Sequence, residues 1–388
     1  MTRWNGNDER VSAVSPDITD ETNALPAKYF TDPDVWEMEK EKVFSQYWVY
    51  AGHENCISEA GEYFTRTIGD KQVIVARDEE GEVRAFYNVC AHRGSKMVDD
   101  TPMTDPGTMS RIQCPYHLWT YDLDGDLRST PRSFEEAELN PDLDDDDVCG
   151  LDSDDTGGLD PDENGLMEVH TDSIGPLVFL NFAEDPSLSL AEQAGKLKTR
   201  LESLPLEEYE HARRYVSEVE CNWKTFGGNY SECDHCQANH QDWITGIQLD
   251  ESELEVNDYH WVLHYTHEED VEDELRIHDE HEAQFHYFWP NFTVNMYGTA
   301  DGYGTYIIDP IDEGRFQLIA DYYFAEPELT EEEEEFVRTS RQLQEEDFEL
   351  VERQYEGLTS GALAQGQLGP NEHTLHRFHR LAQEAYNA

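Results

Sequence analysis

The chain has 388 residues, 37% of them hydrophobic, so it is long enough to bury the cores of two or three domains. Its 86 acidic residues against 27 basic ones give a formal charge of −59, and this excess argues against a nucleic-acid-binding protein. No apolar run reaches the length that crosses a bilayer, and the N-terminus lacks the apolar stretch of a signal peptide. We therefore expect a cytoplasmic protein without a membrane partner.

The acidic residues are spread along the chain instead of forming one tail. Such a surface repels itself in dilute buffer and is screened at molar salt. We interpret the charge as an adaptation to a salt-rich cytosol, as in halophilic archaea. The seven cysteines favour a reducing compartment over a disulfide framework, because four of them lie in or beside candidate metal motifs.

The N-terminal part of the chain is predicted to be a helical segment followed by short strands. Residues 1–45 are expected to be an N-terminal helical segment that packs on the larger, C-terminal domain, since Trp36, Phe44 and Trp48 recur at roughly helical intervals. Alternating runs then predict strands at 63–68, 72–77 and 83–87. We assign residues 46–165 to a small all-β domain, with an acidic insertion at about 140–165.

Residues 166–388 are predicted to form the second domain, which begins with the buried strand 177–182. Helices mixed with antiparallel strands are the α+β pattern. The expected helices are 187–204, 225–243 and 329–359, and the clearest strands are 306–308 and 315–320.

The most informative motif of the first domain is Cys90-x-His92 followed by Cys114-x-x-His117. Two thiolates and two imidazoles arriving as Cys-His pairs suit a [2Fe-2S] cluster with both cysteines on one iron and both histidines on the other. A structural zinc site is the alternative, but such sites usually group cysteine with cysteine and histidine with histidine. The alternation favours the cluster.

A second motif places His235 and His240 five residues apart. In a regular helix they would point roughly 140° apart, so they converge only where the helix is bulged or broken. Two histidines and one carboxylate on one face of an iron leave positions open for oxygen and substrate. The flanking Cys233 and Cys236 form a Cys-x-x-Cys pair, which could indicate redox chemistry or zinc binding. We interpret them as buried small hydrophobic residues, because no βαβ redox context surrounds them.

Together these motifs resemble the large (alpha) subunit of the Rieske non-haem iron oxygenases. The similarity lies in the two Cys-His pairs, in Asn222-Trp223-Lys224 followed by Glu232-x-x-His235-x₄-His240, and in the segment 344–358. Respiratory Rieske proteins differ, since the places of their extra disulfide cysteines hold Ser95 and Tyr116.

The resemblance implies a role for each residue of the two motifs. Residues 166–388 would be the catalytic domain, with a helix-grip-like fold and a mononuclear Fe(II). The cluster ligands would be Cys90, His92, Cys114 and His117. The iron ligands would be His235, His240 and Asp347. Glu232 would bridge the iron site to the cluster of a neighbouring subunit in a homotrimer, accepting a hydrogen bond from His92 or His117. Electrons would come from NAD(P)H through a separate reductase or ferredoxin, to activate O₂ against a small organic substrate.

The substrate is less sharply indicated. Glutamate at position 232 and the C-terminal segment are similar to oxygenases of quaternary or tertiary amines, and an aromatic cage for a cation is available from Phe285, Tyr287, Trp289 and Tyr297. A dioxygenase that hydroxylates aromatic rings is the alternative. A Rieske electron carrier without oxygenase activity is the third possibility, and it would hold two irons per chain instead of three.

Overall fold

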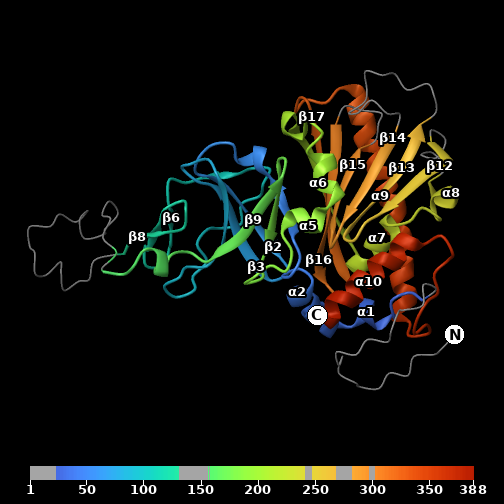
Figure 1. The fold of residues 1–388 in the computed structure, drawn as a ribbon, viewed down its shortest axis with the longest axis horizontal. Helices are drawn as coiled ribbons and strands as arrows, with labels where there is room; N and C mark the ends of the chain where they lie inside the picture. Colours follow the sequence, from blue (N-terminus) through green and yellow to red (C-terminus); the bar gives the residue numbers. More distant parts are fainter. Residues whose placement is uncertain (1–22, 131–155, 157, 241–246, 268–281, 297–301) are drawn as a thin grey trace, which may run out of the picture. The chain divides into compact units, whose positions relative to one another are not determined.

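The computed structural model describes residues 23–130, 156, 158–240, 247–267, 282–296 and 302–388. It divides into two compact units, one comprising Ala51–Asn181 and the other comprising Phe182–Ala388 together with the segment that ends at Tyr50. The α+β class predicted from the sequence is confirmed, with a small all-β unit and a larger unit in which helices cover an antiparallel sheet (Figure 1).

The small unit is built on a seven-stranded sheet of order β1-β10-β9-β4-β3-β2-β5 and a three-stranded sheet of order β6-β7-β8. Its strands are β1 (Val49–His53), β2 (Glu62–Ile68), β3 (Lys71–Arg77), β4 (Val83–Tyr87), β5 (Gly107–Thr108), β6 (Ile112–Gln113), β7 (Thr120–Tyr121), β8 (Leu127–Ser129), β9 (Glu168–Ile174) and β10 (Leu177–Asn181), with short 3₁₀ turns at Glu54–Ile57 and Asp162–Asn164. Gly69, at φ +62°, makes the tight turn that pairs β2 with β3. Most of the acidic insertion lies outside the described residues.

The larger unit holds a second seven-stranded sheet, antiparallel throughout, of order β11-β17-β16-β15-β14-β13-β12. Its strands are β11 (Glu210–Val219), β12 (Ile247–Val256), β13 (His260–His267), β14 (Glu282–Phe288), β15 (Phe292–Met296), β16 (Gly302–Asp312) and β17 (Arg315–Phe324). The helices are α1 (Lys28–Thr31), α2 (Pro33–Lys42), α5 (Leu190–Ala194), α6 (Lys196–Leu201), the 3₁₀ turn Leu206–Glu208, α7 (Trp223–Tyr230), α8 (Cys236–Asn239), α9 (Glu331–Thr359) and α10 (His373–Asn387).

Helices α7, α9 and α10 pack on one face of this sheet. Phe226 of α7 lies 5.4 Å from Phe316 of β17 between ring centroids, and Phe378 of α10 lies 5.8 Å from Tyr287 of β14. The Tyr306 hydroxyl of β16 hydrogen-bonds Ser340 of α9 at 2.6 Å. The core of the unit therefore lies between these helices and the sheet. A site on this face of the sheet has the helices on one side and the strands on the other.

A buried ion pair fixes the start of α7. The carboxylate of Glu39 in α2 accepts hydrogen bonds from Lys224 Nζ at 2.6 Å, from Trp223 Nε1 at 2.9 Å and from the hydroxyl of Tyr386. Both charged side chains of the pair are fully buried. This arrangement ties α2, α7 and α10 together and sets the path of the chain that continues to His235.

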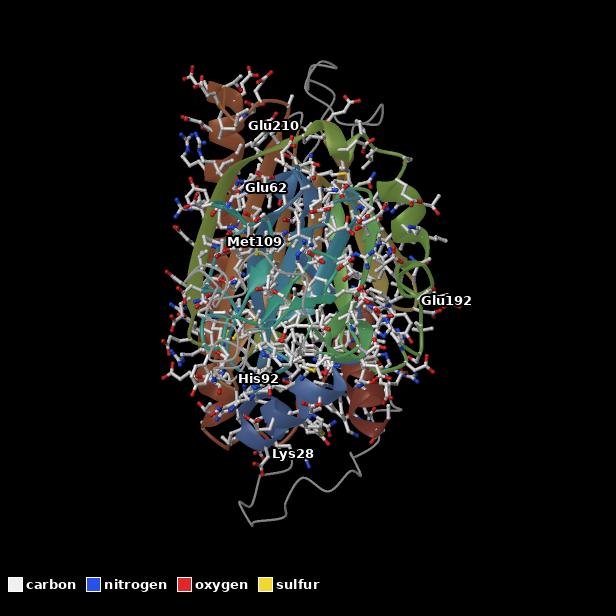
Figure 2. All side chains as sticks on the ribbon, turned by 90° about the vertical axis from the view of Figure 1, so that its left-hand side faces the viewer. Lys28, Glu62, His92, Met109, Glu192 and Glu210 are labelled. Carbon is white, nitrogen blue, oxygen red and sulfur yellow. A yellow bond between two sulfur atoms is a disulfide. The ribbon has the colours of Figure 1, made fainter. Side chains whose placement is uncertain are left out.

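Oxygen-tipped side chains surround the ribbon in Figure 2 and do not gather in one patch. This distribution agrees with the spread of acidic residues along the sequence. In the part of the chain that the structure describes, no helix combines the length and the apolarity that crossing a bilayer requires.

Candidate metal centres

The first candidate centre is built from two tight loops of the small unit. In the loop after β4, the Gly94 N–H donates to the Cys90 carbonyl at 2.9 Å, and Gly94 has φ +73°. In the loop between β6 and β7, the Leu118 N–H donates to the Cys114 carbonyl at 3.0 Å, and Leu118 has φ +59°. Each loop thus turns back through a positive-φ residue four positions after its cysteine.

The loops divide their ligand atoms between the interior and the surface. Cys90 and Cys114 are only 2% and 1% exposed, whereas His92 is exposed and His117 is partly exposed (Figure 2 labels His92). The two imidazole rings lie 4.7 Å apart between centroids, and His92 stacks on Trp119 at 4.6 Å. Both cysteines therefore lie on the buried side and both histidines on the outer side, as a cluster with one Cys₂ iron and one His₂ iron requires.

The two thiols of the cysteine side differ in their electrostatics, since burial raises the pKa of Cys90. Burial opposes ionisation of Cys114, but hydrogen bonds from the backbone N–H groups of His117 and Tyr116 outweigh it and lower the pKa of the thiol. The thiolate is the form that binds metal. The hydroxyl of Tyr121 lies 3.3 Å from Cys90 Sγ, and hydrogen bonds to cluster sulfurs tune the reduction potential.

The second candidate centre lies where the chain leaves α7. The helix predicted around 225–243 is broken, as the convergence of His235 and His240 requires, because α7 ends at Tyr230 and the single turn α8 starts at Cys236. The Glu232 carboxylate replaces helical hydrogen bonds here, since it accepts from the Asp234 N–H at 2.5 Å and contacts His235 Nδ1 at 2.6 Å. His235 and His240 flank α8, with ring centroids 5.2 Å apart. The break brings together two histidines that a regular helix would separate.

Asp347 of α9 completes this second cluster. Its Oδ1 lies 3.2 Å from Nε2 of His235 and 3.2 Å from Nε2 of His240. This oxygen is buried and accepts no hydrogen bond. Since Nδ1 of His235 meets Glu232 and Nδ1 of His240 meets Glu346 Oε2 at 2.8 Å, both Nε2 atoms remain for a metal. The donor set of two imidazoles and one carboxylate fits a mononuclear iron.

The charges of the second centre also fit a cation. Burial lowers the pKa of His235, but its contacts with the carboxylates of Asp347 and Glu232 outweigh this effect and raise the pKa to about 10. The same balance, with Asp347 as the main partner, raises the pKa of His240. Burial raises the pKa of Asp347, and the two histidines reverse that effect and lower it. The electrostatics of the site therefore favour a positive charge, which a bound metal ion would supply.

Cys233 and Cys236 form a disulfide in the structure. Our interpretation of them as buried small hydrophobic residues is therefore wrong, and the redox alternative fits the structure better. Cys236 Sγ lies 3.9 Å from Nε2 of His235, so the disulfide belongs to the wall of the second centre.

A small cavity of about 80 Å³ opens beside the histidines and Asp347. Of the four residues predicted to form an aromatic cage, only Phe285 lines it among the described residues; Tyr287 and Trp289 lie under Phe378 of α10, and Tyr297 lies outside the described part of the chain. The sequence analysis missed the other aromatic residues that line the cavity, because they lie on separate elements and share no sequence motif: Phe226, Tyr230, Tyr265 and Tyr306.

Comparisons with known proteins agree with this geometry. Residues 47–139 match the model of the Rieske [2Fe-2S] domain, and residues 206–388 match that of the ring hydroxylating alpha subunit (catalytic domain). The chain carries both domains of the Rieske oxygenase alpha subunits and is homologous to them. The oxygenase is 28% identical to the carnitine monooxygenase oxygenase subunit of Escherichia coli (strain K12), over 97% of this chain and 100% of that protein.

Two further relatives have similar coverage. The chloroplastic choline monooxygenase of Spinacia oleracea is 27% identical over 96% of this chain and 81% of its own length. A crystal structure of a quaternary ammonium Rieske monooxygenase superposes with a TM-score of 0.79 at 24% identity, covering 95% of this chain and 97% of that one, and it shows the shared fold.

As a member of this family, the chain is an oxidoreductase that carries a Rieske [2Fe-2S] cluster and a mononuclear iron. A reductase or ferredoxin supplies its electrons, and its substrates are small organic molecules. The interpretation as an electron carrier without a second iron is thereby set aside.

Proposed function

We propose that this oxygenase hydroxylates a carbon bonded to the nitrogen of a quaternary or tertiary amine. Where that carbon is an N-methyl group, the product loses formaldehyde and leaves the demethylated amine. The observation that carries this proposal is that aromatic side chains line the cavity beside His235, His240 and Asp347. We call these side chains the aromatic wall: Phe226, Tyr230, Tyr265, Phe285 and Tyr306. The relatives named for carnitine and choline, both quaternary amines, support it.

The aromatic wall offers ring faces to a cation. Tyr265 and Phe285 pack edge to face with centroids 5.7 Å apart, and Tyr230 packs edge to face with Tyr306 at 6.4 Å. A desolvated quaternary ammonium gains about 2 kcal/mol from such faces, and an exposed one about 0.5–1 kcal/mol. Among the described residues that line the cavity there is no lysine or arginine to repel the cation.

We assign the metal ligands as the sequence suggested. Cys90, His92, Cys114 and His117 would hold the cluster, and His235, His240 and Asp347 would hold the iron. When bound, the iron supplies the activation of O₂. Glu232 and Glu346 keep the Nδ1 protons of the two histidines in place, which directs each Nε2 toward the iron.

We further propose a homotrimer in which Glu232 connects the iron of one copy with the cluster of the next. Two observations support this route: His92 is exposed on the outer side of its loop, and the Glu232 side chain keeps 15% of its surface accessible while it contacts His235. NAD(P)H would be the source of the electrons, and a salt-rich cytoplasm the working environment. As domain limits we propose 1–45 for the N-terminal segment, 46–165 for the cluster domain and 166–388 for the catalytic domain.

The cation preference is tested by a pair of ligands of the same shape. Choline and 3,3-dimethylbutan-1-ol differ in the charged nitrogen that replaces a carbon atom. We expect choline to bind about 2- to 30-fold more tightly, which corresponds to about 0.5–2 kcal/mol. Binding is measured by titration calorimetry at molar salt.

Two substitutions at one position make the control. Tyr265→Leu should remove most of the preference, whereas Tyr265→Phe keeps the ring and should retain it. Equal binding of the two ligands by the unaltered protein would contradict the proposal. Tighter binding of an aromatic acid than of choline would favour the alternative, a dioxygenase that hydroxylates aromatic rings.

A further inference from the structure

The disulfide between Cys233 and Cys236 has no part in the mechanism above. Its two sulfurs bracket His235 in the sequence and line the same cavity as His235, His240 and Asp347. Cys236 is only 4% exposed. Cys233 packs against the cluster that Tyr265 forms in the aromatic wall. The disulfide thus forms part of the wall of the iron site.

Disulfides that form in a reducing compartment are usually catalytic or redox-sensing. The spacing Cys-x-x-Cys is the one found in disulfides that open and close readily. Two electrons and two protons convert this disulfide into two thiols, and a dithiol donor that supplies them becomes a disulfide itself. The chain can therefore exist in two states that differ at the cavity wall.

The two states offer different ligands to a metal. In the disulfide, the Cys236 sulfur is bonded to Cys233 and is not a thiolate, and the thiolate is the form that binds metal. In the structure, whose disulfide is closed, one ligand atom from each of His235, Cys236 and His240 already lies within 4.8 Å of the others. Opening the disulfide would therefore free a sulfur that is close enough to bind one ion together with both histidines. A thiolate is a soft ligand that favours zinc, whereas carboxylate and imidazole with open positions suit non-haem iron.

We propose that Cys233 and Cys236 are a redox switch that gives this chain a second metal-binding state. With the disulfide closed, His235, His240 and Asp347 bind the metal and leave its other positions open. With the disulfide reduced, the Cys236 thiol loses its proton and binds the same metal, so a position needed for O₂ is occupied. This inference rests on the iron ligands assigned under the proposed function, and not on the identity of the substrate.

The test uses zinc as the probe, because its absorption edge is separate from that of the cluster iron. Protein with its [2Fe-2S] cluster intact and its mononuclear iron removed receives one equivalent of Zn²⁺. X-ray absorption at the zinc edge is recorded before and after reduction by a phosphine, which takes up oxygen from water as it opens the disulfide. We expect no sulfur neighbour before reduction and one sulfur at about 2.3 Å after it.

Two variants that both lack the disulfide separate ligation from structural damage. Cys233→Ser leaves Cys236 as a free thiol and should show the zinc–sulfur contact without any reductant. Cys236→Ser should never show it. Absence of sulfur in both the reduced protein and Cys233→Ser, with histidine neighbours present, would overturn the switch and leave the iron ligands standing. Absence of histidine neighbours in every form would overturn the ligand assignment and the switch with it.

Discussion

The buried pair of Lys224 and Glu39 gives the sharpest prediction about stability. In Lys224→Met, the carboxylate of Glu39 stays buried and keeps only the neutral donors Trp223 and Tyr386. Removing one partner of a buried ion pair costs about 3–5 kcal/mol, because the remaining charge loses its compensation. This is a large part of the roughly 5–15 kcal/mol that stabilises a typical domain.

The assay is urea unfolding followed by tryptophan fluorescence at molar salt. Salt weakens exposed ion pairs but screens a fully buried pair far less, so the loss should persist there. The double variant Lys224→Met/Glu39→Gln removes both charges and should be more stable than the sum of the two single losses predicts. A change under about 1 kcal/mol in Lys224→Met, or strict additivity in the double variant, would refute the reasoning.

Three other perturbations address the metal sites and the fold. Asp347→Asn should lower the iron content from three to two per chain while the visible spectrum of the cluster is unchanged; three irons in this variant would exclude Asp347 as a ligand. Glu232→Gln should keep all three irons, since its amide oxygen can still accept from His235, yet slow oxygenation, and unchanged turnover would contradict a bridging role. Burial raises the pKa of Asp321, but its hydrogen-bonded basic neighbours, Arg214 among them, outweigh burial and lower the pKa overall. Asp321 therefore stabilises the fold above its ordinary pKa near 3.8. This contribution is lost as the pH falls through the lower pKa that Asp321 has in the folded protein. Arg214→Met should therefore shift acid unfolding to higher pH, and an unmoved midpoint would show that the pair adds nothing.

The sequence predicted best where the chemistry is local. Cys90 with His92, and Cys114 with His117, each lie in one short loop, so their spacing alone indicates how they can share a cluster. Asp347 is far from both histidines in sequence, and composition offers 86 carboxylates. Only the resemblance to a family selected it, and the structure places its Oδ1 3.2 Å from both imidazoles.

The predictions of the aromatic cage and of the state of Cys233 and Cys236 were wrong because both depend on contacts of the folded chain that no short motif reveals. Strand alternation puts Phe285, Tyr287 and Trp289 on one face of β14 and its continuation, but α10 covers the last two and leaves only Phe285 at the cavity. The spacing of Cys233 and Cys236 did not reveal their disulfide, because the break between α7 and α8 that turns the chain there depends on the contacts of Glu232.

The central claim is tested most directly by a single turnover at molar salt. The protein is reduced chemically and mixed with O₂ in the presence of choline-like amines, betaines or aromatic acids, so no partner reductase is needed. We predict formaldehyde or another aldehyde together with the matching hydroxylated or demethylated product from an amine, and none from the aromatic acids. A diol or phenol from an aromatic acid, with the amines unchanged, would contradict the account.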